Sequence, residues 1–191
     1  MDFTTPEFYF FFLPISLFSC FVLFSKNPKA RVFSIVFFSY YFFFLASGWY
    51  LILLIASTSV DFKASKIIFN STDTFYRKKV LLCSLFFNLS LLGTFKYLDF
   101  FIENFNIFSD NIGIYGELDL VHLVLPVGIS FYTFQTMSYT IDVYRNNIEP
   151  EDSFVNFACY ASFFPQLVSG PIERGKNLIP QFNFLLYRNK K

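Results

Sequence analysis

The sequence predicts an all-helical protein embedded in a membrane, with five spanning helices and one re-entrant segment. Of its 191 residues, 54% are hydrophobic and only 15% are charged, and the mean hydropathy is +0.47. This composition is typical of lipid-embedded protein, in which a spanning helix needs about 20 predominantly apolar residues. The length leaves room for five or six such segments and for no soluble domain, so residues 1–191 are predicted to lie in one membrane-embedded domain.

Charged residues divide the chain into uncharged stretches of near-spanning length. These stretches are 8–25, 32–60, 80–95, 120–141 and 153–172. The second is too long for one helix and short for two. We divide it at residues 47–50, because Gly48 favours a turn and the aromatic pair after it suits the membrane interface. One helix is expected to end near Ser47, and the next to run past Asp61 to about Ile68.

Lys and Arg set the predicted orientation. Basic residues follow the first and third predicted helices, at Lys26, Lys29, Arg31, Lys63, Lys66, Arg77, Lys78 and Lys79. Cytoplasmic loops carry an excess of Lys and Arg, so both loops are predicted to be cytoplasmic and the N-terminus to lie outside. No Lys or Arg occurs between Lys96 and Arg145. That connection, predicted to be an outside loop, carries four carboxylates instead, at Glu103, Asp110, Glu117 and Asp119.

The last uncharged stretch is predicted to dip into the membrane and return. A sixth full crossing would place Arg174, Lys176 and the basic residues of 188–191 outside, against the same rule. Pro165 and the pair Gly170-Pro171 favour a re-entrant segment over 153–170. Proline removes a helical donor, and non-helical backbone persists at membrane depth only where protein or a cavity surrounds it.

Several classes of function are excluded by composition. Cys20, Cys83 and Cys159 lie in apolar runs without a C-x-x-C spacing, and the chain has one histidine, so neither a metal site nor a disulfide framework is expected. The net charge of +1 does not suit a nucleic-acid-binding protein. Asp2 and Glu7 stand where a cleaved signal peptide would carry basic residues.

The fifth uncharged stretch carries a polar stripe. On a helix, positions alternating by four and three place Gly128, Tyr132, Gln135, Tyr139 and Asp142 on one face, with Thr133, Thr136 and Thr140 beside them. Polar groups left bare in hydrocarbon are costly, so this face should turn inward. Two interpretations stay equally open: the residues hydrogen-bond neighbouring helices, or they line a tunnel.

Residues 154–174 form a second cluster with candidate roles. Gln166 directly follows Pro165 and is placed to hydrogen-bond backbone groups that a helix break would free. Gly170 permits a tight turn before Pro171. Glu173 and Arg174 are interpreted as a solvated pair at the membrane edge rather than a substrate clamp.

His122 is the one imidazole in the chain. It lies at the predicted outer end of the fifth spanning helix, with Asp119 three residues before it and no Ser or Cys spaced as a nucleophile. We therefore interpret it as an interfacial residue. Asp99 and Glu103, four apart, are interpreted as a solvated helix face.

Five sequence blocks, in matching order and spacing, carry a resemblance to a known family. They are 12–14 (Phe-Leu-Pro), 93–97, 125–135 (Leu-Pro-Val-Gly-Ile-Ser-Phe-Tyr-Thr-Phe-Gln), 141–145 and 162–174. In these blocks the chain resembles the membrane-bound O-acyltransferases, in the branch of the alginate O-acetyltransferase membrane subunit and the D-alanyl-lipoteichoic acid protein. Several long blocks over most of the chain are more specific than one short motif.

The resemblance implies an enzyme of the bacterial inner (cytoplasmic) membrane. It would pass an acetyl or other acyl group from a cytoplasmic thioester donor, acetyl-CoA or an acyl-carrier thioester, to an extracytoplasmic polysaccharide such as alginate. A periplasmic or extracellular partner protein would assist, and no cofactor would be resident. The family carries its catalytic histidine in the second half of a much longer chain. We therefore expect this chain to be an N-terminal portion, inactive alone, with no catalytic residue.

The resemblance also suggests roles for residues in the matching blocks. One wall of the tunnel and its cytoplasmic mouth would be formed by Ser130, Tyr132, Gln135, Asp142, Arg145 and Gln166, together with Tyr139 of the stripe. Structural breaks would lie at Pro165, Gly170 and Pro171. The alternative is a non-enzymatic scaffold, channel or transporter subunit, in which the same stripe would line a permeation path.

Overall fold

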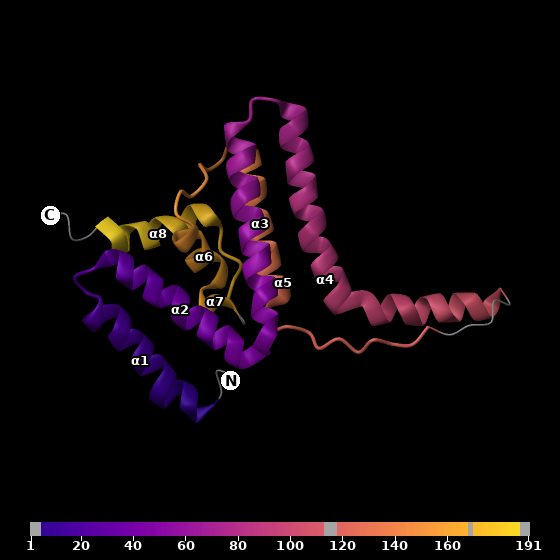
Figure 1. Ribbon diagram of the computed structural model, residues 1–191, viewed down its shortest axis with the longest axis horizontal. Coiled ribbons are helices and arrows are strands. Elements are labelled where there is room, and N and C mark those ends of the chain that lie inside the picture. Colours follow the sequence, from indigo (N-terminus) through magenta and orange to yellow (C-terminus); the bar gives the residue numbers. More distant parts are fainter. Residues whose placement is uncertain (1–4, 113–117, 168–169, 188–191) are drawn as a thin grey trace.

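The computed structural model describes residues 5–112, 118–167 and 170–187, and within them it is all-helical (Figure 1). The elements are η1 (Phe8–Phe12), α1 (Leu13–Phe18), η2 (Ser19–Leu23), α2 (Pro28–Ser47), η3 (Gly48–Tyr50), α3 (Leu51–Asn70), α4 (Thr74–Asn111), α5 (Ile129–Tyr144), α6 (Phe154–Ser162), α7 (Phe164–Leu167) and α8 (Gly175–Tyr187). The predicted all-α class is confirmed for these residues. The acidic residues Asp2 and Glu117 and the basic residues of 188–191 lie outside them.

The predicted break between the second and third helices is confirmed. The Asn27 side chain caps α2 by accepting a hydrogen bond from the Ala30 backbone N–H at 3.2 Å. The helix ends at Ser47, and Gly48 follows with a φ of +60°, a backbone conformation that glycine adopts without strain. The helix α3 then carries Asp61 into the interior.

The helices α3, α4 and α5 lie side by side and form the centre of the fold (Figure 1). On one side of them, α2, α6 and α8 pack together around an apolar cluster that includes Val32, Tyr139, Phe157 and Ile179. The helix α5 is buried on several faces, so its polar residues meet protein rather than lipid.

The helix α4 is longer than the sequence analysis expects. An outside connection is predicted beyond Lys96, with Asp99 and Glu103 on a helix face, and the helix continues to Asn111 and turns away from the bundle about halfway along (Figure 1). The charges beyond Lys96 end the uncharged stretch 80–95 but not the helix. A charge can end a membrane span without ending a helix, and the apolar side chains of residues 97–108 continue at helical spacing.

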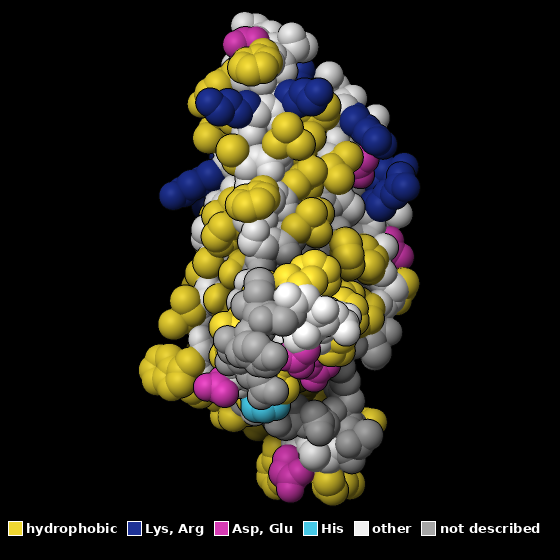
Figure 2. All heavy atoms as spheres, turned by 90° about the vertical axis from the view of Figure 1, so that its right-hand side faces the viewer, with side chains coloured by type: hydrophobic (Ala, Val, Ile, Leu, Met, Phe, Trp, Pro, Cys, Tyr) yellow, Lys and Arg dark blue, Asp and Glu magenta, His cyan; other side chains and the backbone are white. Residues whose placement is uncertain are grey.

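Two stretches of helix are long and apolar enough to cross a membrane, Pro28–Asn70 and Thr74–Asn111, and Phe8–Leu23 is a shorter apolar stretch. The five-span arrangement stays a prediction. The Lys and Arg side chains visible in Figure 2 gather toward the end where α3 and α4 are joined, and the histidine lies toward the opposite end.

Candidate functional site

A hollow of about 1150 Å³ opens where the starts of α2, α6 and α8 meet the end of α5. Its volume is slightly above the range of about 300–1,000 Å³ that is usual for small-molecule sites. Side chains of both signs line it, among them Lys29, Tyr139, Glu149, Glu151, Asp152 and Lys176.

Tyr139 forms the inner wall of this hollow. Its hydroxyl accepts a hydrogen bond from the backbone N–H of Glu151 at 2.7 Å, and its ring centroid lies 4.7 Å from that of Phe157. The start of α8 lies directly against the ring, because a Cβ added to Gly175 would come within 2.7 Å of Tyr139 Cδ2. Glycine at this position thus lets α8 close one side of the hollow.

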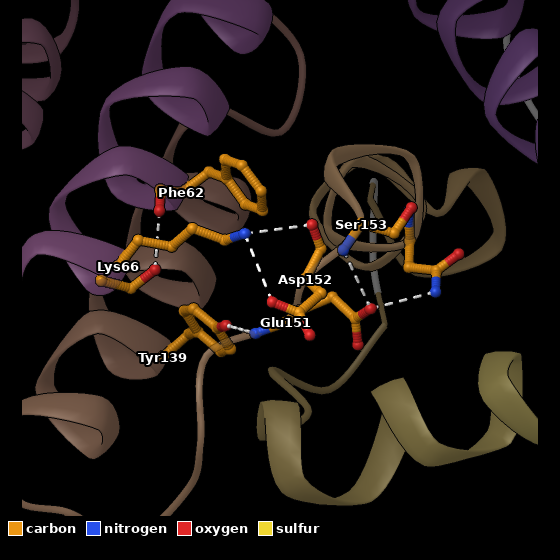
Figure 3. Close-up of polar contacts among 8 residues, drawn as sticks. Phe62, Lys66, Tyr139, Glu151, Asp152 and Ser153 are labelled. Carbon is orange, nitrogen blue, oxygen red and sulfur yellow. Dashed lines mark hydrogen bonds and ion pairs between the residues drawn. The ribbon is translucent and has the colours of Figure 1, made fainter. Parts of the chain in front are cut away.

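The segment before α6 is held in place by hydrogen bonds (Figure 3). The carboxylate of Glu151 accepts from the Ser153 backbone N–H at 3.2 Å and from Asn156 Nδ2 at 3.1 Å. Lys66 on α3 donates to the Asp152 carbonyl oxygen at 3.1 Å and lies 3.4 Å from its carboxylate. This rim of the hollow is therefore fixed to α3, at the end of the bundle rich in Lys and Arg.

The predicted stripe on α5 is buried, and it contacts α6 and the loop after α5. Gln135 Nε2 donates to the Tyr160 carbonyl oxygen at 2.7 Å, and the Tyr160 hydroxyl donates back to the Gln135 carbonyl oxygen at 3.1 Å. Asp142 accepts from Asn147 Nδ2 at 3.1 Å. Tyr132 is also buried, and its hydroxyl has no hydrogen-bond partner among the described residues.

Of the stripe, Tyr139 lines the 1150 Å³ hollow. Ser130 is half-buried at the start of α5, and Arg145 is exposed just beyond its end. These positions are compatible with interhelical bonding and, at Tyr139, with a cavity wall. Tunnel lining by the remaining stripe residues stays a prediction.

The break near Pro165 lies two residues earlier than expected. Phe163 separates α6 from α7, and Pro165 occupies the first turn of α7, where its missing N–H is not needed. Gln166 Nε2 donates to the Pro171 carbonyl oxygen at 2.5 Å, and Gly170 N–H donates to the Gln166 carbonyl oxygen at 2.9 Å. Gln166 thus binds the backbone just after α7, and its predicted bonding to groups freed by a helix break at Pro165 stays a prediction. Residues 168 and 169 lie outside the described part of the chain.

A buried carboxylate at the centre of the bundle was not singled out from the sequence. Asp61 is 0% exposed, and Asn88 Nδ2 donates to both of its oxygens at 3.0 Å. Ser84 donates to the same carboxylate, and α5 turns the Thr136 and Thr140 hydroxyls toward it. A usable signal was present: Ser84 and Asn88 are four residues apart in an apolar stretch, and ionisable residues within spanning helices usually face polar partners.

His122 lies away from the hollow, on the segment beside the second part of α4. Its side chain is 77% exposed, and its Nδ1 atom is 3.8 Å from Asp99 Oδ2. Among residues 5–112, 118–167 and 170–187, no three His, Cys, Asp or Glu side chains are grouped to ligate a metal ion.

Known proteins similar to this chain are O-acetyltransferases. It is 33% identical to a peptidoglycan O-acetyltransferase of Helicobacter pylori, over 98% of this chain and 40% of that protein. It is 32% identical to a probable alginate O-acetylase AlgI of Pseudomonas syringae, over 96% of this chain and 35% of that protein. Over 50% of this chain, it is 42% identical to the probable alginate O-acetylase AlgI of Pseudomonas aeruginosa, and the matched part is 18% of that protein.

These relatives are membrane-bound O-acyltransferases, and the similarity to them extends over almost the whole of this chain. Similarity to membrane O-acetyltransferases, together with the two long apolar helical stretches, supports a membrane location for the chain. The scaffold, channel or transporter interpretation is not favoured by these relatives. The chain spans at most 40% of the length of these three relatives. No protein-family model matches this chain, and no solved structure matches it significantly.

Proposed function

We propose that this chain forms the donor-binding side of an enzyme that O-acetylates a polysaccharide outside the cytoplasmic membrane. The donor would be a cytoplasmic thioester, acetyl-CoA or an acyl-carrier thioester, and the acceptor a glycan of the peptidoglycan or alginate kind. The observation that carries the proposal is the hollow at the cationic end of the bundle, with Lys29 and Lys176 on its rim and Tyr139 in its wall.

The two lysines of the hollow, Lys29 and Lys176, suit the phosphate groups of such a donor. Two of the three carboxylates there are engaged by protein groups, Glu151 by Asn156 and Asp152 by Lys66. Coenzyme A and the phosphopantetheine arm of a carrier both bear phosphate, and lysine ammonium groups bind phosphate oxygens through charge-assisted hydrogen bonds. Lys66 holds the opposite rim by its contact with Asp152. From Tyr139, the stripe continues along α5 to Tyr132, whose hydroxyl has no partner among the described residues, and we propose that the acyl path follows this helix.

The proposed topology has five spanning helices, an outside N-terminus and a re-entrant segment. The starts of α6 and α8 border the same hollow, so the chain enters and leaves at one end of the bundle. With nine residues, α6 is about 14 Å long and is too short to cross a hydrocarbon core of about 30 Å. Basic residues at the hollow support a cytoplasmic location for it.

Acyl transfer also needs a general base that takes the acceptor hydroxyl proton and donors that stabilise the oxyanion. The described residues at the hollow provide lysines, carboxylates and a buried tyrosine, while His122 lies away from it, on the segment that returns beside α4. We therefore assign donor binding to this chain and place the catalytic base elsewhere in the enzyme, where an extracytoplasmic partner protein and the acceptor would meet.

Donor binding is tested with the chain reconstituted in lipid nanodiscs and titrated with acetyl-CoA. Reversing the rim charge in Lys29→Glu or Lys176→Glu should weaken binding by about tenfold, since a charge-assisted hydrogen bond contributes about 1.5–3 kcal/mol. Lys63→Glu is the matched control, because Lys63 is exposed on α3 and does not line the hollow. Equal losses in all three variants, or none, would contradict the proposal.

Transfer itself is tested in membranes that contain only these 191 residues. Radiolabel from acetyl-CoA should reach an added glycan acceptor no faster than in membranes without the chain. Turnover that depends on His122 and is lost in His122→Ala would overturn the assignment of the base to another part of the enzyme.

A further inference from the structure

The second part of α4 and the segment that returns beside it form a projection from the bundle, which we call the arm. The arm comprises residues 94–111 and 118–127. It leaves the bundle at the end opposite the junction of α3 and α4, which carries the basic residues Arg77, Lys78 and Lys79 (Figure 1).

One face of the arm helix is polar and is covered by the returning segment. The carboxylate of Asp99 accepts from the backbone N–H groups of Val121 at 2.9 Å and His122 at 3.1 Å. The Asn106 side chain binds both backbone groups of Leu118, accepting from its N–H at 3.0 Å and donating to its carbonyl oxygen at 2.9 Å. The returning segment is therefore fixed to this face at two points seven residues apart.

The opposite face of the arm helix is a stripe of four aromatic side chains. Tyr97, Phe101, Phe105 and Phe108 follow one another by steps of four, four and three, which keeps them on one side of a helix. Their exposed fractions lie between 43% and 62%. At 100° per residue, this stripe points away from Asp99 and Asn106.

The direction of the stripe follows from the position of the returning segment. That segment runs along the side of the arm that faces away from the spanning part of α4 (Figure 1). The aromatic stripe therefore faces the layer that the spanning helices occupy. A face directed there meets the boundary between lipid head groups and acyl chains, the region in which aromatic residues of membrane proteins concentrate.

We propose that the arm lies flat on the bilayer, with the stripe Tyr97, Phe101, Phe105 and Phe108 inserted in the lipid interface. The occupant of this face is thus phospholipid. The charged residues of the arm helix are Lys96, Asp99, Glu103 and Asp110, a net negative set. Insertion depends on aromatic burial and not on attraction to anionic lipids, so it should be insensitive to salt. The proposed orientation makes this the outer leaflet.

A depth measurement tests the proposal in the whole chain. Trp49 is the one tryptophan, so Trp49→Phe provides a background into which Phe105→Trp is introduced. Glu103→Trp is the matched control on the polar face. Each variant is reconstituted in vesicles of phosphatidylcholine and phosphatidylglycerol, and fluorescence is quenched by brominated lipid or by aqueous acrylamide.

Tryptophan at 105 should emit at shorter wavelength and be quenched by brominated lipid several-fold more strongly than tryptophan at 103, at low and high salt alike. Equal acrylamide quenching at both positions would overturn the proposal, because the stripe would face water. Protection of position 105 from both quenchers would also overturn it, because protein would then cover the stripe. If Phe105→Trp loses helical circular dichroism, Phe101→Trp makes the same measurement one turn earlier.

Discussion

Asn88 on α4 donates its side-chain amide to both carboxylate oxygens of Asp61 on α3, at 3.0 Å each. Both side chains are fully buried, and Ser57 one turn before Asp61 donates to Asn88 Oδ1 at 2.5 Å. The Thr136 and Thr140 hydroxyls of α5 face the same carboxylate. Three helices thus share one polar cluster, and an alternative register would leave a carboxylate without donors in a low-dielectric interior.

Asn88→Leu should therefore destabilise the fold. It removes the amide that binds both oxygens of Asp61 and leaves the carboxylate short of donors, at a cost of about 1–3 kcal/mol. Reversible unfolding by a denaturing detergent measures the change. Asn104→Leu is the control on the same helix, since Asn104 is exposed and bonds only its own turn, at Phe100. Equal stability of the two variants would show that the cluster contributes nothing.

Gly128 and Gly48 form a second matched pair. Both have positive φ, +72° and +60°, but a Cβ on Gly128 would lie 2.5 Å from the Leu167 carbonyl oxygen, whereas one on Gly48 meets nothing within 4 Å. Gly48→Ala should cost about 1 kcal/mol from backbone strain. Gly128→Ala should cost about 1–3 kcal/mol more, because α7 must move away from α5. The same unfolding assay compares them, and equal losses would contradict the contact.

Two buried tyrosines differ in their hydrogen bonding: the Tyr160 hydroxyl has partners, and the Tyr132 hydroxyl has none among the described residues. The Tyr160 hydroxyl lies 3.1 Å from the carbonyl oxygens of Gln135 and Glu173, so Tyr160→Phe should cost about 1–2 kcal/mol. Tyr132→Phe should leave stability unchanged within about 0.5 kcal/mol, since the lost hydroxyl has no partner among the described residues. Thermal unfolding in detergent measures both. A larger loss at Tyr132 would reveal a partner for its hydroxyl.

The predictable parts of this fold are those with local causes. The break before α3 follows from Gly48, and the burial of the α5 stripe follows from the cost of polar groups in hydrocarbon. The cluster around Asp61 was not recognised, because its partners on α4 are 23 and 27 residues away and sequence spacing does not determine which helices become neighbours. The full length of the arm helix was not recognised, because the uncharged stretch ends at Phe95 and only Asp99 and Glu103 were placed on a helix face beyond it.

Gly175→Ala tests the geometry of the hollow. The added methyl group would meet the Tyr139 ring at 2.7 Å, so α8 must shift and the wall beside Lys176 must change shape. The free energy of unfolding should fall by about 1–3 kcal/mol. The free energy of acetyl-CoA binding to the chain in nanodiscs should fall by more than this. Gly93→Ala is the control, because nothing lies within 4 Å of its Cβ position. Unchanged affinity for acetyl-CoA in Gly175→Ala would show that the donor does not bind in this hollow.

The topology is tested by cysteine labelling in intact cells. Cys83 is exposed, so Cys83→Ser gives the background, with Cys20 and Cys159 buried. Lys176→Cys and Lys63→Cys should resist a membrane-impermeant maleimide until the membrane is permeabilised, because both are proposed to be cytoplasmic. Glu103→Cys on the polar face of the arm should react in intact cells. If Lys176→Cys also reacts from outside, residues 153–170 cross the membrane completely. The hollow between α6 and α8 then cannot open to a cytoplasmic donor.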